Sequence, residues 1–231
     1  LISNQALAAR AFQPDDARHI QEAIWLRDIS RWAHGEGFDD VSRATALFDW
    51  SVRNIQLEGD NEPVPRRPWQ ALVSGRGTAE QRAWAFARLC RQQGLDVVIL
   101  SLATDAASDK NTDAKTAPDK FWLPAVVSED HLYLFDTRLG LPIPGPGGKG
   151  VATLEQVRKD DALLRKLDIE DEKYPVTAAS LKNVEIGLVA DPFTLSRRAS
   201  QIEANLAGDD RLVLTAKPSE LAGRLKSIPS V

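Results

Sequence analysis

Four side chains between residues 78 and 136 are of types that take part in nucleophilic catalysis. Thr78 and Cys90 carry a hydroxyl and a thiol that could act as nucleophiles, and His131 and Asp136 are of the types that serve as a general base and its orienting acid. Such a set would catalyse acyl transfer or the hydrolysis of an amide. Whether these groups can act together depends on the elements that position them.

The two nucleophile types fall on one predicted helix that begins after Thr78 and is closed by Gly94. Thr78 is in the N-cap position, so we expect its hydroxyl to cap the helix, a role worth about 1 kcal/mol, rather than to attack a substrate. Cys90 lies about three turns further on, away from the positive end of the helix dipole. We therefore expect Cys90 to be a core residue, on an inward face made up of Ala83, Phe86, Ala87 and Cys90.

The base and acid types fall on a predicted hairpin of strands Trp122–Val127 and Leu132–Phe135. His131 lies in the predicted turn, and an offset of five residues along a strand puts two side chains on opposite faces. We therefore expect a solvated His131. Asp136 is expected to be a strand-end residue that bonds the backbone of the following loop.

No metal or cofactor site is predicted. His19 and His34 lie fifteen residues apart on or after the first predicted helix, a separation of over about 20 Å, so they cannot share a metal ion. A single cysteine excludes a cysteine-based zinc cluster. The glycine-rich run 145–150 lacks the residue order of a phosphate-binding loop, so we interpret it as a flexible loop.

Helices dominate the predicted first part of the chain. Asp15–Ala33 is an amphipathic helix whose apolar positions include Trp25 and Trp32, and Asp40 begins a second helix with Ala44, Leu47 and Phe48 on one face. The six tryptophans are interpreted as core and helix-packing residues. The remaining predicted elements are a helical turn at 69–73, a buried strand at 97–100, a long surface loop at 106–119, a helix at 153–167, strands at 184–189 and 212–215, and helices at 195–206 and 219–225.

The charge balance and hydropathy exclude two classes of partner. Lys+Arg 29 against Asp+Glu 33 gives a net charge of -4, which leaves little room for the basic surface that nucleic acid requires. The longest apolar stretch, residues 97–103, is far shorter than the roughly 20 residues of a membrane helix. We therefore expect a soluble protein, either cytoplasmic or exported after loss of a signal, that binds neither nucleic acid nor a membrane interior. The absence of methionine suggests a processed or truncated chain.

The order of these elements resembles the transglutaminase-like core of the papain-like cysteine hydrolases. The matching pieces are the turn Gly75-Arg76-Gly77-Thr78, the helix end Leu89-Cys90-Arg91-Gln92-Gln93-Gly94, the strand Phe121-Trp122-Leu123, and Leu134-Phe135-Asp136 with the four residues that follow. The likeness covers roughly residues 44–140. In that family the nucleophile begins the helix, a histidine precedes the first strand of the hairpin and an aspartate ends the second.

Two of the three catalytic positions differ from the family pattern. Thr78 or the adjacent Ala79 stands where the family has cysteine, and about Lys120 stands where it has histidine, whereas Asp136 is retained. A threonine hydroxyl inside a chain has no anionic population comparable to a thiolate. A lysine is protonated near neutral pH and is a poor general base. The resemblance therefore implies the fold without the chemistry.

These observations predict an α+β protein in two parts: a degenerate transglutaminase-like domain at 1–150 with a helical N-terminal part, and a smaller α/β segment at 151–231, either a second domain or an extension of the first sheet. We expect a non-catalytic module that uses the family cleft to bind a peptide or protein. The binding candidates are Trp69, Trp122, His131 and Arg138. One alternative is a thiol-independent amidase, peptidase or acyl transferase with a site rebuilt from His131, Asp136 or Lys120. Another is an assembly role for the C-terminal segment.

Overall fold

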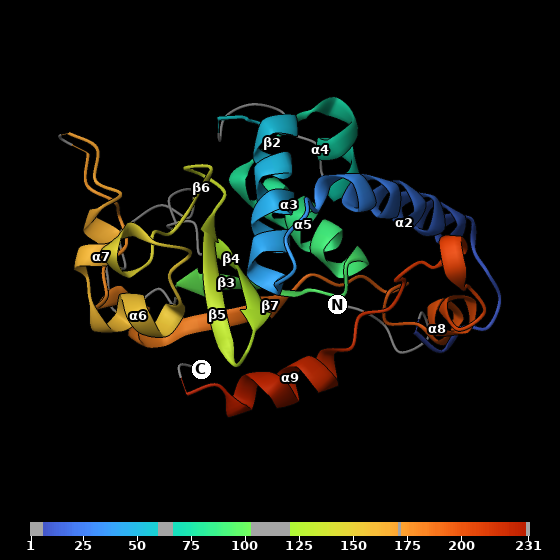
Figure 1. Cartoon of the computed structure of the whole chain (residues 1–231). Helices are drawn as coiled ribbons and strands as arrows, with labels where there is room; N and C mark the ends of the chain where they lie inside the picture. Colours follow the sequence, from blue (N-terminus) through green and yellow to red (C-terminus); the bar gives the residue numbers. More distant parts are fainter. Residues whose placement is uncertain (1–6, 60–66, 103–120, 171, 230–231) are drawn as a thin grey trace, which may run out of the picture.

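The structure is a computed structural model that describes residues 7–59, 67–102, 121–170 and 172–229. It confirms the α+β class: a five-stranded sheet in the order β6-β5-β4-β3-β7 lies at the centre, and helices cover both of its faces (Figure 1). The predicted loop at 106–119 and the position Lys120 lie outside the described residues. Within the described part, no helix is long and apolar enough to cross a bilayer.

Three helices build the layer on one face of the sheet. They are α2 (Pro14–Ala33), α3 (Asp40–Asn54) and α5 (Ala79–Gln92), joined by the short helix α4 (Pro68–Ser74) and a two-stranded sheet of β1 (Gln56–Leu57) and β2 (Arg76–Gly77). The inward faces predicted for α3 and α5 are confirmed, since the residues expected there are buried. These apolar positions recur every three or four residues and therefore share one side of each helix. Phe48, Phe86 and Phe135 meet in this core with ring centroids 5.1–5.5 Å apart.

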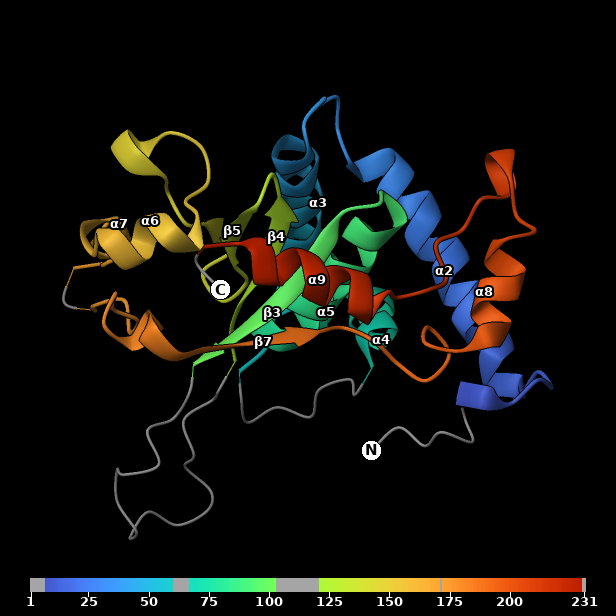
Figure 2. The ribbon, with the colours of Figure 1, turned by 90° about the horizontal axis from the view of Figure 1, so that it is seen from below.

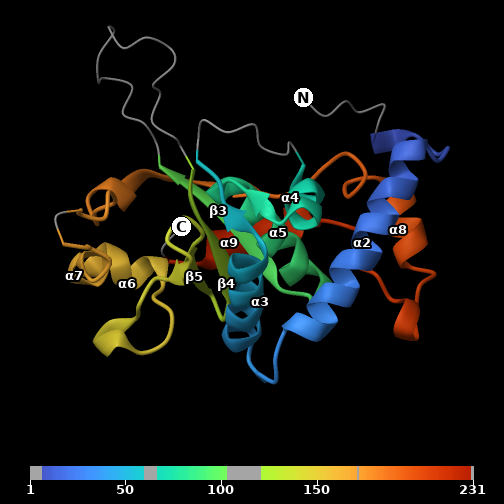
Figure 3. The same cartoon turned by 90° about the horizontal axis from the view of Figure 1, so that it is seen from above.

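The predicted face of α2 is partly wrong. Its buried side is formed by Ala23, Leu26 and Ser30, together with two carboxylates, whereas Trp25 is 42% and Trp32 80% exposed. Helix α2 packs mainly along α5 and lies beside the C-terminal helix α8 (Arg197–Glu203) (Figure 3). Because those neighbours offer arginines, α2 turns acidic residues rather than tryptophans inward.

The sheet is built from antiparallel pairs. Strands β3 (Asp96–Leu102), β4 (Phe121–Ser128) and β5 (His131–Asp136) are consecutive, and β6 (Leu141–Pro142) pairs with β5. The predicted hairpin is confirmed, and its two-residue turn has positive φ at Glu129 and Asp130, as a type I′ turn requires. His131 is thus the first residue of β5 rather than part of the turn.

The C-terminal part completes this sheet. Strand β7 (Val184–Leu188) pairs with β3, so of the two alternatives left open by the sequence this strand is an extension of the first sheet. The face opposite α5 is covered by α6 (Leu154–Lys159), α7 (Ala162–Arg165) and α9 (Pro218–Ser227), and Figure 2 shows α9 crossing the sheet. Apolar residues from both sides of residue 150 form one cluster on this face. The division at residue 150 stays a prediction.

Two predicted elements of the C-terminal part are wrong. The single helix expected at 153–167 is divided into α6 and α7, with Asp160 between them accepting a hydrogen bond from the backbone N–H of Ala162. The strand expected at 212–215 does not form. Its backbone bonds side chains instead: Val213 exchanges two hydrogen bonds with the amide of Gln92, and one carboxylate oxygen of Glu203 accepts the N–H groups of the next two residues.

Candidate functional site

The first of the predicted catalytic positions, Thr78, is the N-cap of α5. Its hydroxyl accepts a hydrogen bond from the backbone N–H of Gln81 at 3.2 Å, and the side chain of Gln81 accepts the N–H of Thr78 at 3.1 Å. This reciprocal capping box satisfies two backbone donors at the helix start. The expected structural role of Thr78 is confirmed, and its hydroxyl is engaged by its own helix.

The acidic position, Asp136, is the last residue of β5 and is 3% exposed. One carboxylate oxygen accepts the backbone N–H groups of Arg138 and Leu139, each at 2.8 Å, which confirms the expected bonds to the following loop. The other oxygen accepts the hydroxyl of Tyr174 at 2.6 Å. Within the described residues, the hydrogen bonds of this carboxylate therefore go to backbone and tyrosine groups, not to a histidine.

Thr78 and Asp136 also lie on different sides of the sheet. Side chains alternate along a strand, and Leu134 belongs to the cluster on the face opposite α5, as does Tyr174. Asp136 therefore shares that face, consistent with its bond to Tyr174. The next residue, Thr137, faces α5 instead, and its hydroxyl donates to the carbonyl of Ala79 at 2.8 Å.

A buried arginine fills the space between the start of α5 and the end of β5. The guanidinium of Arg82 donates to the carbonyl of Ile55 at 3.0 and 2.5 Å and to that of Thr137 at 2.8 Å. Burial lowers the pKa of this guanidinium. The sequence analysis missed Arg82, although its position four residues before Phe86, on the predicted inward face of the helix, was a signal that could have revealed it.

The four binding candidates do not form one cluster. His131 is the first residue of β5 and Arg138 follows its other end, so the two lie seven residues or about 20 Å apart along the chain. His131 is half-buried and meets the ring of Tyr133 edge-on, whereas Arg138 is exposed. Trp69 lies on α4. Trp122 is in β4, and its side chain lies outside the described part of the structure.

Cys90, the only thiol, is fully buried on α5 as expected. Burial raises its pKa well above the ordinary value, and the charge of Arg43 opposes this shift only weakly. A thiol in this state is a poor nucleophile.

His34 follows α2 and is remote in sequence from the other histidines. No group of three or more metal-ligand types occurs within the residues that the structure describes.

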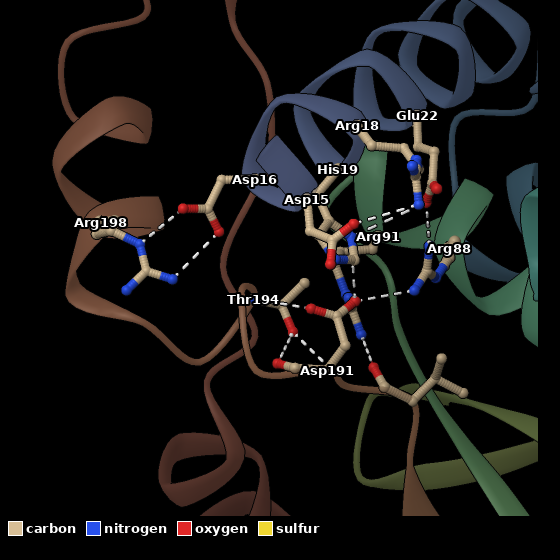
Figure 4. A network of polar contacts seen from close by, with 11 residues as sticks. Asp15, Asp16, Arg18, His19, Glu22, Arg88, Arg91, Asp191, Thr194 and Arg198 are labelled. Atoms are coloured by element: carbon tan, nitrogen blue, oxygen red, sulfur yellow. Dashed lines mark hydrogen bonds and ion pairs between the residues drawn. The ribbon is translucent and has the colours of Figure 1, made fainter. Parts of the chain in front are cut away.

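A polar network not expected from the sequence joins α2, α5 and the segment after β7 (Figure 4). Arg88 donates to Glu22 at 3.0 Å and to Asp191 at 2.9 Å, and His19 lies 3.7 Å from Asp191. The ring of His19 stacks on Phe193 at a centroid distance of 5.3 Å. These groups come from three distant parts of the chain, so spacing along the sequence gave no sign of them.

A second buried ion pair lies beside this network. Arg198 of α8 binds both carboxylate oxygens of Asp16, at 2.9 and 3.1 Å. Burial raises the pKa of Asp16, but the hydrogen bonds from Arg198 and from the backbone of Gln13 and the charge of Arg198 outweigh it, so this pKa lies below its usual value. The pair fastens α8 to the first turn of α2.

The network borders a hollow of about 490 Å³. Trp69 lines it, and its indole N–H is buried without a hydrogen-bond partner among the described residues. One carboxylate oxygen of Glu22 and the Nε of Arg88 are also buried without a hydrogen-bond partner among the described residues. A volume of this size accommodates a peptide side chain or a small ligand. Trp69 is thus the one binding candidate that the structure places in a hollow among those whose side chains it describes.

Two comparisons with known proteins found similar sequences or structures. Residues 26–127, from α2 to β4, match a family model described as the transglutaminase-like superfamily. No curated protein matches the chain. A solved structure from Cytophaga hutchinsonii, that of a candidate cysteine protease, is similar with 13% identity and a TM-score of 0.40. The match covers 82% of this chain and 62% of the other, so this chain spans less than two thirds of that protein's length.

Proposed function

We propose that the chain is a non-catalytic transglutaminase-like protein that binds a peptide or protein, on the premise that residues 26–127 match the model of that superfamily. The observation that carries the proposal is the use of Thr78. Its hydroxyl accepts a backbone hydrogen bond of its own helix, and no terminal amine or thiol stands at that position. A nucleophile needs a base that takes its proton, and among the described residues none accepts a hydrogen bond from the hydroxyl of Thr78.

The contacts of Asp136 support the same proposal. In a catalytic triad the acid orients the base and stabilises its charged form. Here both oxygens of the carboxylate are engaged, one by two backbone N–H groups and the other by the hydroxyl of Tyr174. Among the described residues no histidine donates to this carboxylate, which accepts three other hydrogen bonds.

The proposed binding surface centres on the hollow at Trp69. An indole ring contributes a large apolar area and a directional N–H, the combination enriched in binding hot spots. A peptide carbonyl could accept that N–H. Arginine and carboxylate side chains around the hollow would contribute to the choice of partner through charge.

Absence of turnover is tested on the full chain. The protein is assayed for hydrolysis of casein, for deamidation of a glutamine peptide and for transfer of a fluorescent amine to casein, with Thr78→Ala and Asp136→Asn as comparison variants. We expect the wild type and both variants to match the buffer control. Turnover in the wild type that either substitution removes would overturn the proposal in favour of a thiol-independent hydrolase or acyl transferase.

Binding is tested with a displayed library of nine-residue peptides selected on the immobilised chain. Synthetic versions of the recovered peptides are then titrated against Trp69→Ala, with Trp32→Ala as the matched control because Trp32 is an exposed tryptophan on another helix. We expect a class of peptides that loses at least tenfold in affinity for Trp69→Ala and none for Trp32→Ala, and Trp122→Ala should also weaken its binding. Equal affinity of folded Trp69→Ala and wild type for every recovered peptide would overturn the assignment of the hollow.

A further inference from the structure

Strand β7 forms one edge of the five-stranded sheet. It pairs with β3 on one side and is the last strand in the sheet order, and Figure 2 shows it along the margin of the sheet. None of the described residues outside β3 has a backbone hydrogen bond to residues 184–188. An unpaired strand edge is a template for another strand, and it accepts only an extended backbone.

The direction of the backbone groups follows from the pairing register, starting at the β4–β5 turn. The two-residue turn closes on the pair Ser128–His131, so the N–H and C=O groups of Ser128 point toward β5. This direction alternates along a strand, and Ala125, three residues away, therefore points its groups toward β3. Ala125 pairs with Val98, so the backbone groups of Val98 point toward β4.

The same alternation carries over to the sheet edge. Ile99 follows Val98 and points its backbone groups toward β7, where its partner is Gly187. Gly187 therefore faces β3. Its neighbours Ile186 and Leu188 face away from the sheet with both their N–H and C=O groups, at the spacing that an added strand requires.

A hollow of about 300 Å³ lies beside this edge on the face toward α5. Gly187 and Ile99 form its floor, and Trp84 of α5 forms a wall. Gly187 leaves this side of the strand open, because a Cβ there would meet the carbonyl oxygen of Ile99 at 3.7 Å, an ordinary contact. Gly187 thus leaves a space at the centre of a free strand edge.

We propose that the outer edge of β7 binds an extended peptide strand that places a bulky apolar side chain opposite Gly187. The proposal rests on the proposed binding function but assigns it to a second surface, distinct from the hollow at Trp69. An added strand would bond the backbone of Ile186 and Leu188. Its residue opposite Gly187 would form a non-hydrogen-bonded pair, in which side chains approach most closely, and would fill the space beside Trp84.

The composition of β7 agrees with an edge that is used selectively. Short strands and charged side chains discourage indiscriminate pairing, and β7 has five residues with Glu185 exposed. Glu185 lies two residues from Gly187 on the same face of β7, so it favours a basic residue two positions from the apolar one in an added strand. Arg88, which lines the hollow, already pairs with Glu22 and Asp191. The occupant is therefore a short peptide segment that combines an apolar and a basic residue rather than a long apolar strand.

The decisive variant is Gly187→Val. Because the new Cβ meets only ordinary contacts, we expect the variant to fold with unchanged circular dichroism and a melting temperature no lower than that of the wild type. The added side chain narrows the hollow at the position that the peptide side chain would occupy. Gly223→Ala on α9, where a Cβ meets nothing within 4 Å, is the matched control.

The probes are the nine-residue peptides recovered from the displayed library, measured by fluorescence anisotropy. We expect a class with a central aromatic or large aliphatic residue and a basic residue two positions away. Its affinity should fall at least tenfold for Gly187→Val and remain unchanged for Gly223→Ala and Trp69→Ala. N-methylation of the peptide at alternate amides should abolish binding, because it removes the donors of an added strand.

Three results would overturn the proposal, and they can be told apart from failure of the proposed function. Peptides that lose affinity for Trp69→Ala but not for Gly187→Val would leave only the hollow at Trp69 as a site. A selection that recovers no peptide would contradict both proposals. A dimer in sedimentation experiments that Gly187→Val dissociates would assign the edge to a second copy of the chain.

Discussion

Thr78 occupies the start of α5, and its hydroxyl serves stability there. Its position at the start of α5 is where a helix dipole would favour a thiolate. With a hydroxyl in place, the same backbone N–H groups are satisfied by capping. The type of residue at the start of the helix therefore decides whether these N–H groups stabilise a thiolate or are capped by a hydroxyl.

The capping role predicts a measurable loss of stability. Thr78→Ala removes the acceptor for the N–H of Gln81 and should lower the free energy of unfolding by about 1 kcal/mol. Thr78→Ser retains the hydroxyl and should cost less than half as much. Urea denaturation followed by circular dichroism measures both, and equal stability of Thr78→Ala and the wild type would contradict the role.

Thiol reactivity should differ sharply between the two positions on α5. Native Cys90 should not react with iodoacetamide at pH 8, because burial raises its pKa and excludes the reagent. A thiol introduced by Thr78→Cys lies at the helix N-terminus and should be alkylated within minutes. Mass spectrometry of the native proteins measures this, and rapid alkylation of wild-type Cys90 would show that the core around α5 opens readily.

At the scale of elements, Arg82 connects three segments. Its guanidinium bonds the carbonyl that follows α3 and the carbonyl that follows β5, and it projects from α5. A single cation thus satisfies two buried acceptors that neither helix nor sheet can reach. This arrangement holds the start of α5 against the end of β5.

Removing this cation should be costly. Arg82→Met keeps the aliphatic length but leaves the carbonyls of Ile55 and Thr137 unsatisfied, so the free energy of unfolding should fall by about 3 kcal/mol. Arg53→Met is the control, because Arg53 is exposed and its ion pair with Asp49 should contribute less than about 1 kcal/mol. Urea denaturation measures both. Similar losses for the two variants would contradict the role of Arg82.

The elements that could be predicted from the sequence are those with local signals. Helices α3 and α5 have regular apolar spacing and polar caps, and the β4–β5 hairpin has a short polar turn. The inward face of α2 could not be predicted, because its buried carboxylates are paired by arginines from α5 and α8. The strand expected at 212–215 failed for a related reason, since side chains of Gln92 and Glu203 take the place of a neighbouring strand.

The same distinction applies to the candidate site. The capping role of Thr78 and the loop bonds of Asp136 depend on residues within three positions and were predicted. Tyr174, Arg82 and the hollow at Trp69 depend on contacts between distant segments. No spacing along the chain reports such contacts, although charged residues on predicted inward faces indicate that a buried partner exists.

At the scale of the whole molecule, ion pairs fasten the C-terminal segment to the first helix. Asp16 pairs with Arg198, and Glu22 and Asp191 share Arg88. Breaking one partner of a buried pair leaves an uncompensated charge, at a cost of about 3–5 kcal/mol. The segment after β7 is therefore held by ion pairs in addition to the apolar cluster that contains Phe193 and Ala199.

This attachment predicts a pH dependence with a definite sign. The folded pKa of Asp16 is lower than its unfolded value, so the unfolded chain binds more protons and stability rises with pH between the two values. The contribution of Asp16 is complete above about pH 4 and is lost as pH falls through the folded pKa. Asp16→Asn should be less stable at pH 7 and should show a shallower acid loss than the wild type. Urea denaturation across pH 2–7 measures this, and parallel pH profiles would contradict it.

The position of β7 in the sheet also sets the order in which a newly made chain can be completed. A ribosome releases β3 long before Val184, the first residue of β7, so one edge of β3 stays open while the intervening chain is synthesised. The ion pair of Asp16 in α2 likewise cannot form until Arg198 has been synthesised, nor can that of Arg88 with Asp191 form until Asp191 has been. An incomplete nascent chain therefore exposes a strand edge and unpaired charges, and chaperone protection would be needed until the last segment emerges.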